Sequence, residues 1–79
     1  MRKGVTMLYE REKAMLHKEF RVKRAWKTGH CKMKIGDILK VIDYGSGSAS
    51  DYVVFENSRI PNYRFTCGTW FFINNTEIA

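Results

Sequence analysis

The adjacent pair His30–Cys31 is the most promising place to look for catalytic chemistry in this sequence. A cysteine nucleophile needs an imidazole that converges on its thiol and a third group that orients the imidazole. Neighbouring residues of an extended chain point to opposite faces, so these two side chains diverge if the segment is a strand. A shared metal ion is disfavoured for the same reason, and the chain has neither C-x₂-C nor H-x₃₋₅-H spacing. We therefore expect no catalytic residue and no metal ion.

The remaining candidates for chemistry are carboxylates and a glycine-rich stretch. Asp43 and Asp51 flank the run 45–50, which contains only Gly, Ser and Ala. These aspartates could be paired carboxylates, but their position on either side of a solvated loop is the simpler explanation. The run lacks the Lys-Ser/Thr ending of a phosphate-binding loop, and no helix signal follows it. Asp37 follows Gly36 and is better interpreted as a turn residue than as a general base, so we predict a non-enzymatic protein without a cofactor.

Cysteine content and hydropathy bear on the compartment. Cys31 and Cys67 are the two cysteines, and free thiols are the default in a reducing environment, although a disulfide between the two halves of the chain stays open. No apolar run approaches the ~18 residues that span a bilayer, and no apolar segment follows Arg2 and Lys3 as in a secretory signal. The prediction is a cytoplasmic protein that does not bind membranes.

The strongest signal is an uneven positive charge. The formal net charge is +6, with 14 basic and 8 acidic residues. Residues 1–40 hold twelve basic and four acidic residues, a net charge of +8, whereas residues 41–79 have a net charge of −2. Such asymmetry indicates an anionic partner, because basic side chains neutralise phosphates and exposed aromatic rings stack on bases. The predicted nucleic-acid or partner-binding residues are Arg21, Lys23, Arg24, Trp26, Lys27, His30, Lys32 and Lys34. The alternative is that Trp26 belongs to the core and the lysines form a solvated face.

These residues must be positioned by short elements. Residues 7–19 are the one plausible helix, with Thr6 as its cap, although Val5–Tyr9 could instead form a short strand and residues 1–5 look frayed. From Phe20 onward the chain alternates with a period of two. We expect strands over 20–27, 38–44, 52–56 and 63–67, turns at 27–30, 35–37 and 57–62, a loop at 44–51, and a last strand at Ile78.

Aromatic residues must supply most of the core of so small a domain. The candidates are Phe20, Trp26, Tyr52, Phe55, Tyr63, Phe65, Trp70, Phe71 and Phe72. The run 70–73 is apolar throughout, so it is either a buried short strand or a single helical turn. We expect it to be core, but if only one face is buried, the other forms an apolar patch of the kind that marks partner sites.

The segment Lys34–Ile42 resembles the Gly-Asp turn and following strand of SH3-like and KOW-type domains. The resemblance implies that Gly36 makes a diverging turn and Asp37 accepts hydrogen bonds from backbone donors there. The predicted fold is mainly β: a small five-stranded SH3-like barrel over residues 20–79, preceded by a basic extension or short helix over residues 1–19. The loop Lys27–Lys34 is basic, unlike the acidic loop of SH3 domains that bind proline-rich peptides, although Trp26, Tyr44 and Tyr63 could still line a groove.

Two functions follow from this interpretation. The first is nucleic-acid binding through a positive face, which the resemblance also implies because SH3-like barrels with basic surfaces often bind nucleic acid. The second is regulation of another protein through a basic and aromatic surface. In this second hypothesis the chain is similar to the small virus-encoded proteins that attach to a host enzyme, which are short, basic and rich in aromatic residues. The sequence does not predict the oligomeric state.

Overall fold

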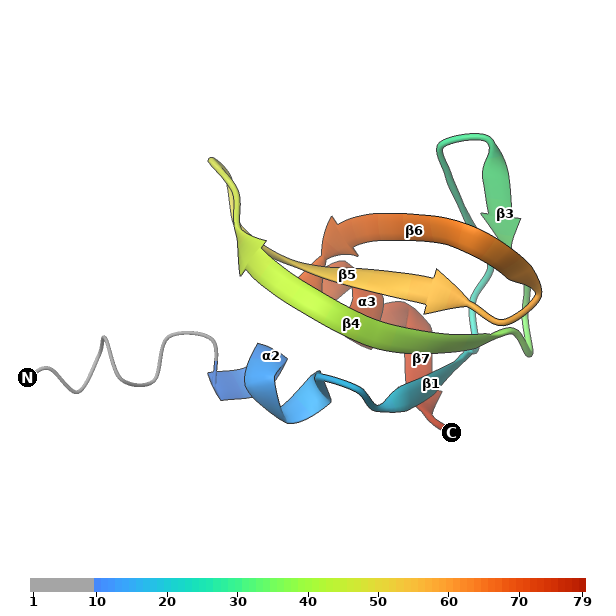
Figure 1. The fold of residues 1–79 in the computed structure, drawn as a ribbon, viewed down its shortest axis with the longest axis horizontal. Helices are drawn as coiled ribbons and strands as arrows, with labels where there is room; N and C mark the ends of the chain where they lie inside the picture. Colours follow the sequence, from blue (N-terminus) through green and yellow to red (C-terminus); the bar gives the residue numbers. More distant parts are fainter. Residues whose placement is uncertain (1–9) are drawn as a thin grey trace, which may run out of the picture.

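A five-stranded antiparallel sheet forms the body of the computed structural model, which describes residues 10–79 (Figure 1). Its strand order is β6-β5-β4-β1-β7, so the first and last strands of the sheet along the chain, β1 and β7, lie side by side. The sheet ends at β6 and β7 and is not closed. The mainly β prediction is confirmed. The strands are β1 (Glu19–Val22), β4 (Ile38–Ser46), β5 (Asp51–Asn57), β6 (Ile60–Gly68) and β7 (Thr76–Ile78).

Alternation along the central strands creates the core. Leu39 and Val41 on β4, with Val53 and Phe55 on β5, are completely buried because every second residue of a strand faces the same side. Phe72 from α3 (Thr69–Asn75) joins them and is also fully buried. Its ring centroid lies 5.1 Å from that of Phe55. Edge-to-face and tilted aromatic packing therefore supplies the dense core that a chain of this size needs.

The apolar run 70–73 is helical, and only part of it is core. The helical period places Phe72 inside and leaves Trp70 and Phe71 60% and 46% exposed. The expectation that the whole run is buried is therefore wrong. Tyr63, another core candidate, is 61% exposed on β6.

A separate two-stranded hairpin interrupts the predicted strand 20–27. Chain pairing stops after Val22 and resumes in β2 (Trp26–Thr28), which pairs with β3 (Cys31–Met33) around a turn at Gly29 and His30. Gly29 has φ +60°, a conformation that L side chains rarely adopt. The predicted turn at 27–30 is thus confirmed at its last two residues, and the hairpin stands at one end of the molecule (Figure 1).

The turn before β4 forms as the sequence predicts. Gly36 has φ +95°, and the Asp37 carboxylate accepts a hydrogen bond of 2.8 Å from the backbone N–H of Lys34. The Gly36 N–H donates to the carbonyl of Val22 at 2.8 Å, so the turn is tied back to β1. A β-carbon at Gly36 meets no atom within 4 Å, which means that the backbone conformation and not crowding calls for glycine here.

The N-terminal helix is shorter than predicted within the described residues. α2 (Glu10–Met15) ends near His17, whose φ of +67° cannot continue a helix. Met15 packs in the core. Between α2 and β1, the backbone N–H of His17 donates to the carbonyl of Val41 on β4 at 2.7 Å. The predicted frayed start, the Thr6 cap, the helical residues 7–9 and the alternative strand Val5–Tyr9 lie outside the described residues.

Two predicted loops are smaller than expected. The turn at 57–62 is confined to Ser58 and Arg59, while Pro61 and Asn62 belong to β6 at a point where its register with β5 is irregular. An edge strand tolerates proline there because no partner needs its missing N–H. The loop predicted at 44–51 covers only residues 47–50, because Gly45 already pairs with Tyr52. A β-carbon at Gly45 would collide with the Tyr52 ring, so this pairing requires glycine. Within residues 10–79, no helix has the length and apolar character needed to cross a membrane.

Candidate nucleic-acid interface

Arginine and lysine play different parts in this molecule. Within residues 10–79 every basic member of an ion pair is an arginine. Arg24 and all seven lysines of that range have no ion-pair partner in it. The pairs are Arg11–Glu12 at 3.5 Å, Arg21–Glu77 at 3.2 Å, Arg59–Asp37 at 2.9 Å and Arg64–Glu56 at 3.9 Å.

Most of the unpaired cations fall in one segment of the chain, residues 23–34, here called the cationic segment. It contains no acidic residue, and its basic residues, all exposed, are Lys23, Arg24, Lys27, Lys32 and Lys34. The other unpaired lysines have acidic neighbours. Lys13 follows Glu12 and Lys18 precedes Glu19. Lys40 lies between Glu19 and Glu56 on the adjacent strands. Positive charge without a compensating acid is therefore concentrated in the cationic segment.

The hairpin β2–β3 separates this charge from the core. Trp26 pairs with Met33, and both are buried; Lys27 pairs with Lys32, and both are exposed. Residues directly opposite in an antiparallel pair lie on the same face, so the two ammonium groups are neighbours. Like charges in this position destabilise a hairpin. The lysine pair therefore does not serve the stability of the isolated fold, and it suits an anionic ligand.

A hydrogen-bonded cluster around Asp37 holds the base of the hairpin. Arg59 Nε donates to Asp37 Oδ1 at 2.9 Å, its Nη2 donates to Oδ2 at 2.9 Å, and Nη2 also donates to the Lys32 carbonyl at 2.6 Å. Asn57 Nδ2 adds a bond of 3.0 Å to Asp37 Oδ2. Burial alone raises the pKa of Asp37, but these donors and the Lys34 N–H outweigh burial and lower it to about 2. The cationic segment is thus attached to a rigid, ionised turn.

The start of the cationic segment lies against α3. The backbone N–H groups of Lys23 and Arg24 donate to the Asn75 carbonyl at 2.9 and 3.2 Å. Further along, the Trp26 ring packs edge-to-face on Phe71 with centroids 5.5 Å apart. The cationic segment therefore begins beside the C-terminal end of α3, the helix that also carries the exposed Trp70 and Phe71.

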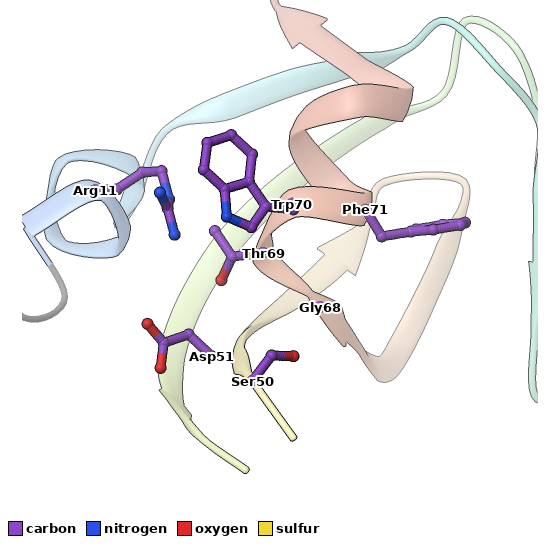
Figure 2. Close-up of a pocket in the computed structure, with 7 residues that line it drawn as sticks. All are labelled: Arg11, Ser50, Asp51, Gly68, Thr69, Trp70 and Phe71. Carbon is purple, nitrogen blue, oxygen red and sulfur yellow. The ribbon is translucent and has the colours of Figure 1, made fainter. Parts of the chain in front are cut away.

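A hollow of about 440 Å³ opens beside α3 (Figure 2). The end of the β4–β5 loop, the end of β6, α2 and α3 all contribute to it. The guanidinium carbon of Arg11 lies 4.2 Å from the centre of the Trp70 ring, a cation–π contact that joins α2 to α3. The residues that line the hollow are Arg11, Ser50, Asp51, Gly68, Thr69, Trp70 and Phe71.

A second groove, of about 370 Å³, runs between the hairpin turn and β6. Thr28, Gly29, His30 and Cys31 form one side, and residues 63–66 form the other. The exposed ring of Tyr63 lies here, but Trp26 and Tyr44, the other two residues suggested for a groove, do not line it. The groove exists because the hairpin folds next to β6, some 30 residues away in sequence, so no local pattern points to Arg64 as one of its residues.

The eight predicted binding residues do not all reach the same surface. Lys23, Arg24, Lys27, Lys32 and Lys34 are exposed and unpaired, and His30 is exposed at the hairpin turn. Arg21 is held by Glu77 of β7. Trp26 is only 9% exposed and packs on Phe55, Phe71 and Phe72. Its assignment as a stacking residue is corrected: Trp26 is core, and the exposed aromatic residues are Tyr63, Trp70 and Phe71.

The two cysteines are free thiols in this structure. Burial raises the pKa of Cys67 to about 12, so that thiol stays protonated at neutral pH and is a poor nucleophile. Cys31 is half-buried beside the hairpin groove. Among residues 10–79, no three His, Cys, Asp or Glu side chains converge in a way that could hold a metal ion.

Comparison with known proteins identifies no relative of this chain. No protein-family model, no curated protein and no solved structure matches this chain. The charge, burial and geometry of the described residues are therefore what supports a function.

Proposed function

We propose that this protein is a non-enzymatic module that binds nucleic acid through the cationic segment. The observation that carries the proposal is the concentration of unpaired, exposed basic residues between Lys23 and Lys34, on a segment without a single acid. Each such contact to a phosphate releases condensed counterions, which is the main source of affinity for a polyanion. We expect the facing pair Lys27 and Lys32 to contribute most to the binding free energy, because a bound phosphate relieves the repulsion between the two ammonium groups.

The type of basic residue supports binding by charge without a fixed geometry. Arginine is suited to bidentate recognition of carboxylates and phosphates alike, and here four arginines bind the protein's own acids, so the unpaired charge is mostly lysine. Lysine is a mobile point charge that contacts phosphates without demanding one geometry. Contacts of this kind position a nucleic acid but do not read its sequence.

We also propose an SH3-like fold with an open sheet, which the order of the elements supports. A strand, a hairpin, the Gly36–Asp37 turn, three antiparallel strands, a short helix and a last strand beside the first follow one another. This arrangement agrees with the resemblance of Lys34–Ile42 to SH3-like domains, and basic members of that class often bind nucleic acid. In the proposed SH3-like fold, the basic hairpin β2–β3 would correspond to the acidic loop of peptide-binding SH3 domains, which again favours an anionic ligand.

A charge-matched pair of variants tests the proposal. Lys27→Gln/Lys32→Gln removes two charges from the hairpin, and Lys13→Gln/Lys18→Gln removes two from the region of α2, towards the other end of the molecule (Figure 1). Fluorescence anisotropy with a labelled 20-nucleotide single strand measures binding. We expect the hairpin variant to bind about tenfold more weakly and the control within about twofold of the original protein. Equal losses in both variants would show that only net charge matters and would contradict a defined site.

A second function is favoured by one observation, the exposure of Trp70 and Phe71. Exposed aromatic residues next to an arginine are typical of protein-binding hot spots, so the chain could instead regulate another protein through this surface. Affinity capture from a lysate separates the two. A single protein that survives nuclease treatment and is lost on Trp70→Ala supports regulation, whereas nuclease-sensitive capture lost on Lys27→Gln/Lys32→Gln supports nucleic-acid binding.

A further inference from the structure

We infer that the hollow beside α3 binds one unpaired nucleobase, with guanine preferred. This inference rests on the proposed function and deepens it, because it adds a base-reading pocket to a phosphate-binding segment. It begins with Trp70, a large aromatic side chain that the fold leaves 60% exposed. The Arg11 guanidinium lies over this ring, 4.2 Å from its centre, and the Trp70 side chain as a whole stays exposed. An exposed indole ring is a suitable platform for a base.

Two buried polar groups beside this platform have no partner. Thr69 is 1% exposed, and its hydroxyl makes no hydrogen bond within the described structure. The Nε of Arg11 is likewise buried and unpaired. Buried polar groups in folded proteins are nearly always hydrogen-bonded, so each exception calls for an explanation. Figure 2 shows the Thr69 hydroxyl directed to the side of the hollow where Asp51 lies, which is where a ligand would supply the missing partner.

The opposite side of the hollow offers an acceptor. The Asp51 carboxylate takes part in no hydrogen bond and no ion pair among residues 10–79. Gly68 lines the hollow without a side chain, so nothing from that position fills it. The site therefore presents hydrogen-bond donors, a two-oxygen acceptor and an aromatic platform around one cavity of about 440 Å³.

This combination matches the edge of guanine better than that of the other bases. Guanine carries two adjacent N–H donors, at N1 and the exocyclic N2, and an acceptor at O6. A carboxylate accepts two parallel hydrogen bonds, so Asp51 suits the N–H pair, while Thr69 or Arg11 suits O6. Adenine and cytosine each offer one amino donor group beside a ring acceptor, and uracil has a single N–H. A purine also covers more of the Trp70 ring than a pyrimidine does.

The hollow and the cationic segment can serve one strand. Lys23 and Arg24 are bonded to the last turn of α3, and Trp70 and Phe71 belong to its first turn. A seven-residue helix spans about 10 Å, so phosphates on Lys23 and Arg24 and a base on Trp70 would be separated by only a few nucleotides. Base-paired guanine has its N–H groups occupied, and the expected ligand is therefore single-stranded.

Octamers of uridine that carry one central G, A or C, and the all-U octamer, provide the test. We expect the G-containing strand to bind about tenfold more tightly than the others and to quench the fluorescence of Trp70. Trp70→Ala is expected to abolish the quenching and most of the guanine preference, and Asp51→Asn and Thr69→Val to reduce the preference. Ser58→Ala, which removes an exposed hydroxyl outside both the hollow and the hairpin groove, is the control and keeps both properties. Circular dichroism confirms that each variant is folded.

The hairpin variant separates failure of this inference from failure of the proposed function. Lys27→Gln/Lys32→Gln is expected to weaken all four octamers alike and to retain the guanine preference and the quenching. Equal, unquenched binding of all octamers by the original protein would overturn the nucleobase pocket and leave the cationic segment standing. If no octamer binds while guanosine 5′-monophosphate still quenches the fluorescence of Trp70, the result supports the base pocket and contradicts nucleic-acid binding through the cationic segment. Protein capture that depends on Trp70 without any response to a nucleobase would assign the hollow to a protein partner and also overturn the inference.

Discussion

The Asp37 turn and the hollow beside α3 contain similar groups in opposite states. Each has an aspartate, an arginine and a small polar side chain. At the turn, Asp37 accepts from Arg59, Asn57 and the Lys34 backbone, and nothing is left unpaired. In the hollow, Asp51 has no partner among residues 10–79, and Thr69 Oγ1 and Arg11 Nε are buried without one.

The difference separates groups that stabilise the fold from groups that are available to a ligand. A satisfied polar cluster fixes the chain around it, here the base of the hairpin that carries Lys27 and Lys32. An unsatisfied cluster costs stability in the free protein and gains hydrogen bonds when a ligand enters. Removal of a polar group should therefore lower the free energy of unfolding strongly at the turn, and should leave it nearly unchanged or raise it in the hollow.

The largest expected effect is on Asp37. Asp37→Ala leaves the Arg59 guanidinium, the buried Asn57 amide and the Lys34 N–H without their acceptor, and we expect a loss of about 2–4 kcal/mol in the free energy of unfolding. Asp51→Ala should change it by no more than about 0.5 kcal/mol, because no hydrogen bond is lost. Urea denaturation of both variants measures the contrast. Comparable losses would mean that Asp51 has a structural role that its surroundings do not show.

The next effect is on the acid stability of the fold. The pKa of Asp37 is about 2 in the folded protein against 3.8 ordinarily, so its contribution is complete above about pH 4 and is lost as the pH falls through 2. The loss should be about 1–2 kcal/mol, less than the shift in pKa alone implies because Arg59 is partly solvated. Thermal denaturation between pH 5 and 2 should show a shallower decline for Asp37→Asn than for the original protein. Parallel curves for the two proteins would place the acid-sensitive group elsewhere.

The smallest expected effect is a change in the free energy of unfolding that has opposite signs for threonine-to-valine substitutions at Thr76 and Thr69. Thr76 is buried, and its hydroxyl donates to the Phe72 carbonyl at 2.8 Å, so Thr76→Val should lose about 1 kcal/mol. Thr69 is buried with an unpaired hydroxyl, so Thr69→Val should be neutral or gain about 0.5–1 kcal/mol. Matched denaturation curves detect the difference in sign. A destabilised Thr69→Val would show that this hydroxyl already has a partner in solution.

The features that the sequence alone could predict are local ones. Gly36 and Asp37 define a turn by their own conformational preferences, and β4 and β5 follow from alternating residues. The same local reasoning locates the basic stretch from Lys23 to Lys34, since charge density is visible in the linear sequence. It could not separate Arg21 from its neighbours, because Glu77 lies 56 residues away and becomes a partner only when β7 pairs with β1.

The candidate base pocket could not be predicted for the same physical reason. Its walls come from α2, β5, β6 and α3, which the chain brings together only in the folded state. Four consecutive apolar residues from Trp70 to Ile73 fit a buried strand or a helical turn equally well. The helix that forms turns Phe72 inward and Trp70 outward, so the ring that looked like core becomes a surface platform. Trp26 shows the reverse, because a tryptophan among basic residues proves to be core.

The most direct test of the account is the salt dependence of binding to a single strand. For the original protein, a plot of log affinity against log salt concentration should have a slope of about −2 to −3, since about 0.7 counterions are released per phosphate contact. Lys27→Gln/Lys32→Gln should make that slope shallower by about 1.4, while Lys13→Gln/Lys18→Gln leaves it unchanged. An affinity that does not vary with salt, or the same slope for the original protein and the hairpin variant, would contradict a phosphate-binding segment between Lys23 and Lys34.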